Sequence, residues 1–291
     1  MLRSLFTGIS GLRAHQMMMD VTGNNIANVN TTGFKGSQVT FQDTFSQLLE
    51  GAAAPQGANQ GGTNPSQVGL GVRVAGMSTN FGNGATQVTG RDTDMRIDGE
   101  GFFVVNAGGE QMYTRAGSFS FDNEGTLVTP EGNPVQGWQA AADGNFGAGL
   151  GTAAAMTNIS RNGSTPAGHT LMGYKVGADG VITGVFRNDT DGSVIQQSVA
   201  QLAVATFPNN EGLEKAGSSN YRESVNSGDV AINVPGAGAN GRLSTGALEM
   251  SNVDLAQEFT NLIIAQRGFQ ANSRVITSSD ELLQDLVNLK R

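Results

Sequence analysis

Histidine and carboxylate side chains are the residues of this chain that could do acid–base chemistry. The two histidines, His15 and His169, lie far apart in the sequence. A histidine that acts in catalysis needs a second reactive group within reach, and the carboxylates are scattered among predicted turns without an obvious acid–base pair. We therefore predict packing or surface roles for both histidines and no catalytic residue.

Two short motifs resemble ligand sites but are incomplete. Asp189-Thr190-Asp191-Gly192 begins like a calcium loop, but Ala200 stands where the closing glutamate is required. Gly69-Leu70-Gly71 lacks the third glycine of a dinucleotide fingerprint and precedes a predicted strand instead of a helix. We expect no metal ligand, no cofactor and no small-molecule substrate.

Composition excludes several further classes of function. The chain of 291 residues has no cysteine, which excludes disulfides, thiolate metal sites and a cysteine nucleophile. Its net charge of −8 argues against nucleic-acid binding and against a polybasic membrane surface. A secreted glycan-active β enzyme is the formal alternative, and it would need a cleft with paired carboxylates.

The N-terminus is neither a membrane span nor a signal peptide. No stretch approaches the roughly 18 to 20 apolar residues of a spanning helix. Polar residues interrupt the opening sequence MLRSLFTGISGLRAHQMMMD, so it has no apolar signal region and no cleavage site follows. The protein either stays in the cytoplasm or leaves by a route without a cleaved signal.

Both ends of the chain are predicted to be helical, because apolar residues recur there at alternating spacings of three and four. This spacing is typical of a narrow coiled-coil seam. The second helix should begin after Ser251 or Asn252 as N-cap, with Asp254 and Glu258 in its early turns. The expected seam residues are Leu5, Ile9, Leu12, Met19, Leu255, Phe259, Leu262, Phe269, Ile276 and Leu283.

Between the helices the sequence predicts an all-β middle. Residues 51–67 carry no charge and no large apolar side chain, which indicates a linker or extended arm. Short alternating runs follow, with hairpin turns at Asp122–Gly125 and Ala178–Gly180. Residues 140–172 show little pattern and form either a small subdomain or a loop. The fold class is therefore α+β, and the end helices either dock on the β part or polymerise with other copies.

Long motifs near both ends resemble the bacterial flagellar rod and hook proteins. The N-terminal match centres on Asn24-Asn25-Ile26-Ala27-Asn28 and on Thr32-Gly33-Phe34-Lys35. The C-terminal half, which begins GALEMSNVDLAQEF, is more similar to hook members than to rod members. The resemblance covers nearly the whole chain except about residues 140–172. Its signature residues are Asn24, Asn25, Ala27, Asn28, Gly33 and Phe34, and the Asn24–Asn28 segment should mark the end of the first helix.

The resemblance implies a helical axial domain at 1–30 and 252–291, paired as a coiled coil. It further implies a connecting arm at 31–66, a mostly antiparallel β domain at 67–139 and 173–251, and a short insertion at 140–172 in place of an outer domain. The expected function is a structural subunit of the flagellar hook, a curved tubular polymer that acts as a universal joint transmitting torque from rod to filament. The alternative is a distal rod subunit, a straight drive shaft, whose arm is similar in length.

The resemblance also implies partners and a location. These are other copies of the chain, the distal rod, hook-cap and hook–filament junction proteins, and the flagellar type III export machinery. The protein would reach the extracellular hook without a cleaved signal peptide. Phe45 and Leu49 fit a Phe-x-x-x-apolar export-gate motif. The pattern is short and frequent, so aromatic residues facing the core on a helical arm are the preferred explanation.

Overall fold

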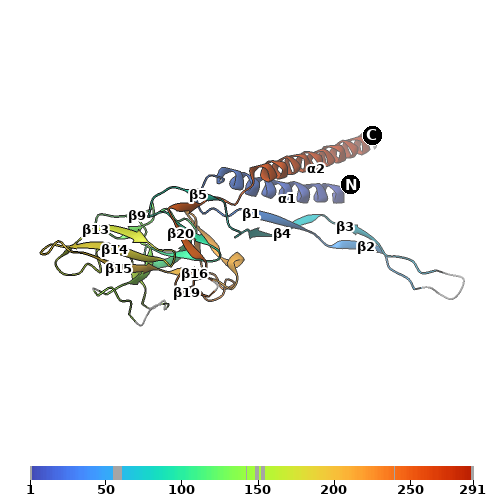
Figure 1. Cartoon of the computed structure of the whole chain (residues 1–291). Coiled ribbons are helices and arrows are strands. Elements are labelled where there is room, and N and C mark those ends of the chain that lie inside the picture. The colour runs from blue at the N-terminus through green and yellow to red at the C-terminus, as the bar shows by residue number, and fades with distance from the viewer. Residues whose placement is uncertain are drawn as a thin grey trace. The chain divides into compact units, whose positions relative to one another are not determined.

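The computed structural model describes residues 2–54, 61–141, 143–147, 151, 155–238 and 240–289. The chain forms two compact units (Figure 1). The helical unit comprises Met1–Asn28, Gly36–Asn80 and Val253–Arg291, and the β unit comprises Val29–Lys35 and Phe81–Asn252. The chain therefore passes between the units four times. The fold class is α+β, as predicted.

Two long helices from opposite ends of the chain form the core of the helical unit. They are α1 (Leu2–Ala27) and α2 (Leu255–Leu289). The N-cap of α2 is Asp254, whose Oδ1 accepts a hydrogen bond from the backbone N–H of Ala256 at 2.8 Å. The expected caps, Ser251 and Asn252, are therefore wrong. The Asn252 amide instead donates to the Gly82 carbonyl at 3.1 Å, because Asp254 already satisfies the first free N–H groups of the helix.

Small residues let α1 and α2 approach closely. A Cβ atom on Gly268 would lie 2.4 Å from the ring of His15, and one on Gly11 would lie 2.7 Å from the side-chain amide of Asn272. Ala265 is fully buried between the helices. The close contact between the two helices therefore depends on glycine at positions where any larger side chain would collide with the other helix.

A two-stranded ribbon completes the helical unit. β1 (Ser37–Asp43) pairs with β4 (Val72–Thr79), and β2 (Ser46–Glu50) pairs with β3 (Ser66–Gly69), both antiparallel. The sequence analysis assigned residues from 67 onward to the β domain. Contacts instead group 67–80 with the helices, because β4 has β1 as its partner. Residues 55–60 of the predicted arm lie outside the described residues.

The β unit is built mainly from two antiparallel sheets. One sheet has the strand order β17-β18-β8-β7-β16-β19 and the other has the order β12-β11-β15-β14-β13. The six strands of the first are Glu214–Gly217, Asn220–Arg222, Glu110–Thr114, Phe102–Ala107, Val204–Thr206 and Ala231–Asn233. The five strands of the second are Thr157–Asn158, Gln136–Gln139, Val194–Leu202, Val181–Asn188 and His169–Val176.

Three two-stranded pairs surround these sheets. They join β9 (Ser120–Phe121) to β10 (Leu127–Val128), β6 (Met95–Asp98) to β20 (Arg242–Thr245), and β5 (Thr86–Val88) to β21 (Ala247–Glu249). A short 3-10 helix spans Asn210–Gly212. The last two pairs join the start of the β unit to its end, so the unit is closed by its own first and last strands.

Strand β7 separates two hydrophobic clusters. Phe103 and Val105 belong to one cluster, and Phe102 and Val104 belong to the other, as expected when successive side chains of a strand point to opposite faces. Residues 157–159 of the predicted insertion contribute to this architecture, because β12 pairs with β11 and Ile159 is fully buried. Residues 142, 148–150 and 152–154 of the insertion lie outside the described residues.

Both predicted hairpin turns are confirmed. Asp122–Gly125 connects β9 to β10, and Gly125 takes a left-handed φ of 85°. Ala178–Gly180 connects β13 to β14, where Gly180 has a φ of 77°. Glycine adopts this conformation without the steric cost that a Cβ atom would add.

Gly268→Val tests the close approach of the helices. The added side chain would collide with His15, so we expect a loss of about 1–3 kcal/mol in the free energy of unfolding of the helical unit. Urea unfolding followed by helical circular dichroism measures this loss. Gly23→Ala is the matched control, because nothing lies within 4 Å of its Cβ position, and it should stabilise the helix by up to about 1 kcal/mol. Equal effects of the two changes would contradict the packing described.

Candidate functional site

The predicted seam residues are divided between half-buried and exposed positions. Half-buried are Leu5, Leu12, Met19, Leu262, Ile276 and Leu283. Exposed fractions are 39% for Ile9, 39% for Leu255, 49% for Phe259 and 36% for Phe269. The positions of α1 that meet α2 include Gly8, Gly11 and His15. The apolar stripe formed by residues 5, 9, 12 and 19 is offset by one residue from these positions, which corresponds to about 100° around the helix. Its role in contacts between copies stays a prediction.

Asn25 joins three elements of the helical unit. Its side chain is 2% exposed. The amide Nδ2 donates to the Ser37 carbonyl at 2.8 Å and to Oε1 of Glu258 at 3.2 Å, and Oδ1 accepts from the Ser37 N–H at 3.0 Å. One amide side chain therefore connects the end of α1, the start of β1 and the first turn of α2.

The other asparagines of the signature end the first helix. Asn28 donates from its backbone N–H to the Asn24 carbonyl at 3.1 Å, and its side-chain Nδ2 donates to the same carbonyl at 2.9 Å. Ala27 is the last residue of α1 and is exposed. The predicted helix exit at Asn24–Asn28 is confirmed.

Gly33 and Phe34 lie in the first segment of the β unit. Gly33 has a φ of 68°, and a Cβ atom there would lie 2.5 Å from the backbone N of Ala116. Its N–H donates to the Glu249 carbonyl at 2.8 Å. The Nζ of Lys215 lies 5.3 Å from the centroid of the Phe34 ring, which is a cation–π contact. The segment is thus fixed by backbone contacts that only glycine permits.

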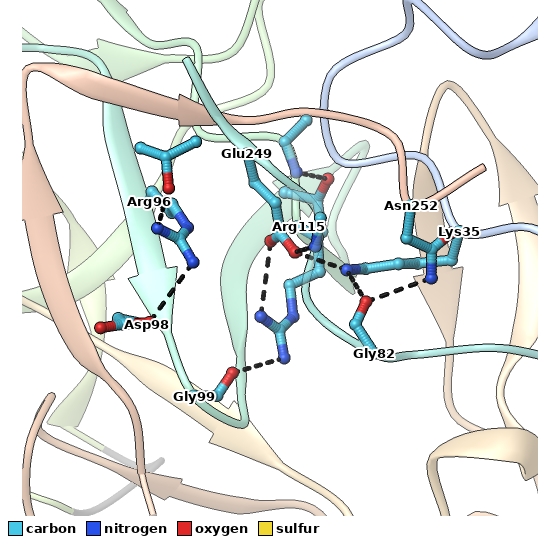
Figure 2. Close-up of polar contacts among 12 residues, drawn as sticks. Lys35, Gly82, Arg96, Asp98, Gly99, Arg115, Glu249 and Asn252 are labelled. Carbon is cyan, nitrogen blue, oxygen red and sulfur yellow. Dashed lines mark hydrogen bonds and ion pairs between the residues drawn. The ribbon is translucent and has the colours of Figure 1, made fainter. Parts of the chain in front are cut away.

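A buried carboxylate between two buried cations forms the electrostatic centre of the β unit (Figure 2). Oε1 of Glu249 lies 2.6 Å from Nζ of Lys35, and Oε2 lies 3.5 Å from a guanidinium nitrogen of Arg115. The exposed fractions of the three side chains are at most 2%. We call this set the Glu249 cluster.

Backbone groups complete the Glu249 cluster. Lys35 also donates to the Gly82 carbonyl at 2.9 Å, Arg115 donates to the Gly99 carbonyl at 3.0 Å, and the Gly84 N–H donates to Oε1 of Glu249 at 2.9 Å. Figure 2 shows these contacts converging from chain segments that are distant in sequence. The cluster joins the unit's first segment, the chain that follows residue 80, and its last strand.

Burial is the largest cause of the pKa shifts of Lys35, Arg115 and Tyr221. Desolvation lowers the pKa of Lys35, although the hydrogen bond and charge of Glu249 oppose that shift. Burial likewise lowers the pKa of Arg115, and burial raises the pKa of the nearby Tyr221 to about 12. Two buried cations thus share one carboxylate. Such a group is tolerated only when it is paired and hydrogen-bonded.

The sequence analysis quoted Lys35 and Glu249 within motifs but did not identify them, together with Arg115, as a set. The available signal was an isolated charge between small and apolar neighbours, in a chain with only 14% charged residues. What the sequence does not show is that the three meet, since Lys35 and Glu249 are 214 residues apart.

The residues considered for chemistry do not form a reactive site. Asp189 lies in the turn from β14 to β15 and accepts a hydrogen bond at 3.2 Å from the hydroxyl of Thr170 in β13. His15 contacts the helix partner and His169 lies at the start of β13. Across the described part of the chain, no group of three or more His, Cys, Asp or Glu side chains could hold a metal ion. No helix in that part is long and apolar enough to cross a membrane.

The candidate export motif lies on strands. Phe45 lies between β1 and β2 with 89% of its surface exposed, and Leu49 lies in β2 with 58% exposed. The explanation by core-facing residues of a helical arm is therefore wrong, because this segment pairs as a ribbon and has no core to face. Recognition of the motif by an export gate stays a prediction.

Comparison with known proteins covers both units. Family profiles match at residues 5–35 (flagella basal body rod protein), 96–184 (flagellar hook protein FlgE/F/G D1 domain) and 244–289 (flagellar basal body rod FlgEFG protein C-terminal). The flagellar basal-body rod protein FlgG of Bacillus subtilis is 48% identical over 293 aligned residues, which cover all of both chains. The flagellar hook protein FlgE of Treponema pallidum is 32% identical over 469 aligned positions, and that of Borreliella burgdorferi is 30% identical over 447, again covering all of both chains.

Glu249→Gln tests the buried cluster. The change leaves Lys35 and Arg115 buried without an anion, so the free energy of unfolding of the β unit should fall by about 3–5 kcal/mol. Urea unfolding followed by the fluorescence of the single tryptophan, Trp138, measures it. Glu110→Gln is the control, since its ion pair with Arg222 is exposed and should contribute less than about 1 kcal/mol. A loss below 1 kcal/mol for Glu249→Gln would contradict the role assigned to the cluster.

Asn25→Asp tests the junction in the helical unit. The new carboxylate loses the donor to Ser37 and faces Glu258, so we expect a loss of about 2–4 kcal/mol. Helical circular dichroism in urea measures it. Adding Glu258→Gln should recover part of the loss, since the two side chains are in contact. Asn24→Asp, on the exposed side of the same turn, should cost less than about 1 kcal/mol. Failure of Glu258→Gln to recover stability would exclude the charge contact.

Proposed function

The chain belongs to the family of bacterial flagellar rod and hook proteins, and we propose that within this family it is a distal rod subunit. In this function many copies form a straight tube that carries motor torque outward. The protein is a structural subunit of the flagellar axis. The specific assignment to the rod replaces the hook that the sequence analysis favoured.

The proposal rests on one observation: this chain matches the rod relative both in length and in sequence identity better than it matches the hook relatives. The rod relative from Bacillus subtilis aligns over 293 residues at 48% identity, whereas the hook relatives at 32% and 30% need alignments of 469 and 447 positions. This chain has 291 residues, so the hook alignments contain long stretches without a counterpart here. A rod subunit needs no such insertion.

The hook remains a second candidate because hook relatives also align with the whole chain. The motifs at both ends are shared by rod and hook members, which explains why the resemblance of the C-terminal half led to the hook. The length of the middle of the chain separates the two classes better than the ends do.

Exposed apolar residues on both helices support polymerisation. Phe259, Ile263 and Ile264 of α2 have exposed fractions of 49%, 57% and 54%, which is unusual for large apolar side chains on one helix. We infer that these residues and the predicted seam contact neighbouring copies. The other proposed partners are the adjoining axial proteins and the flagellar type III export machinery, and the location is the flagellar axis.

Deleting the gene in the bacterium that carries it tests the assignment. A distal rod subunit predicts basal bodies with a shortened rod and neither hook nor filament, because each axial segment is the base for the next. Electron microscopy of isolated basal bodies measures this. A complete rod that lacks only the hook would identify the chain as the hook subunit, and normal flagella would exclude both functions. Restoring the gene on a plasmid is the control.

A further inference from the structure

An open groove runs along α1 on the side away from α2. It has a cavity volume of ≈490 Å³ and lies between α1 and β4. Phe6, Ile9, Met17 and Val74 provide apolar walls, and Arg13 and Arg73 are its charged residues. Phe6 is 68% exposed and Met17 is 40% exposed. Cavities of about 300–1,000 Å³ with apolar walls are typical of ligand-binding clefts, so the groove can hold several side chains.

The groove is positively charged and α2 of the same copy does not fill it. Among the described residues, neither Arg13 nor Arg73 forms an ion pair, and the Arg73 guanidinium donates to the side-chain amide oxygen of Gln42, its neighbour on β1. At about 100° per residue, Phe6 and Arg13 lie roughly opposite the glycines that contact α2. An occupant should therefore combine large apolar side chains with a carboxylate.

Phe45–Glu50 has that combination. Phe45, Leu48 and Leu49 have exposed fractions of 89%, 55% and 58%, and Glu50, which ends β2, is an exposed carboxylate. A run of exposed large apolar residues of this kind marks a binding surface more often than a free one. Asp43, at the end of β1, is a further exposed carboxylate close by in the sequence.

Leu48–Glu50 do not reach the groove of their own copy. Only the Phe45 end of the segment lies near it, because the Phe45 carbonyl accepts a hydrogen bond from the Leu70 N–H at 3.2 Å and Leu70 contacts Thr7 of α1. Leu48 pairs with Gln67, which is five residues before Val72, and Val72 is where β4 begins to line the groove. Five residues of a strand span about 16 Å. Figure 1 shows β2 and β3 extending beyond β1 and β4. Bringing β2 back would break its pairing with β3, so the groove and the segment are complementary surfaces at different places on one unit.

We infer that the groove of one copy receives the Phe45–Glu50 segment of a second copy. The apolar side chains enter between α1 and β4, and the Glu50 carboxylate meets Arg13 and Arg73. This inference rests on the proposed polymer of identical subunits. Two different patches on one chain make a head-to-tail contact, which extends into an open filament when the rotation does not close. The charge pair would fix the register, since complementary charges specify orientation.

Cysteine cross-linking in assembled flagella tests the contact, because the natural chain has no cysteine. Full-length variants that carry Leu48→Cys together with Val74→Cys are expressed in the deletion strain and treated with a short bismaleimide. We expect a ladder of covalent dimers and higher oligomers on denaturing gels, and no ladder for either single variant. Leu48→Cys with Val194→Cys is the control, because Val194 is exposed on the β unit. The absence of a ladder from the Leu48–Val74 pair in assembled flagella, or ladders of equal strength from both pairs, would overturn the inference.

Charge reversal is the second test and separates the contact from a folding defect. Arg13→Glu with Arg73→Glu should reduce the number of assembled rods at least about tenfold, and adding Glu50→Arg should restore most of the loss. Adding Glu214→Arg instead should restore nothing. Normal rods in the double variant, or equal rescue by both changes, would overturn the inference and leave the rod assignment standing. If the gene deletion leaves rod and hook intact, the rod assignment itself fails.

Discussion

The fold of the β unit depends on one buried carboxylate that two buried cations share. Glu249 is the anion for both Lys35 and Arg115, and removing water from three charges is unfavourable unless every one is paired. The Glu249 cluster satisfies this constraint close to the connections between the two units. Lys35, Gly82, Gly84 and Asn252 all lie within a few residues of points where the chain passes between the units. Three of the four connections are therefore held to one another inside the β unit, and a force arriving along one of them is shared with the others.

The helical unit depends on small side chains instead of on a buried ion pair. Glycines and a buried alanine bring α1 and α2 into contact, so most of the large apolar side chains are left for other surfaces. Asn25 then fixes α1, β1 and α2 to one another through three hydrogen bonds. A monomer with so many exposed apolar residues on two helices has an incomplete interior, and copies of the chain are the simplest way to complete it. In the proposed polymer, contacts with neighbouring copies would cover these exposed residues.

The sequence predicted the elements better than their partners. Helices at both ends follow from apolar spacing, and hairpins such as Asp122–Gly125 follow from turn chemistry, because both signals are local. The contact between Gly268 and His15 was missed because a hydrophobic pattern registers large side chains and is blind to small ones. The Glu249 cluster was missed because its members are brought together only by the fold. The pairing of β1 with β4, which places residues 67–80 of the predicted β domain in the helical unit, is a non-local contact of the same kind. Rod and hook were not separated because the shared motifs at the chain ends describe what the two classes have in common.

The separation of 214 residues in sequence between Lys35 and Glu249 also determines the order in which their contacts can form. A chain that emerges with its N-terminus first delivers both cations long before the anion. Until residues 242–249 arrive, β5 and β6 lack their partners β21 and β20 as well. Contacts this distant in sequence form late and slowly, because the loop between them must close first. The last strands of the β unit therefore complete its structure, because β5, β6 and the two buried cations have their partners only when residues 242–249 are in place.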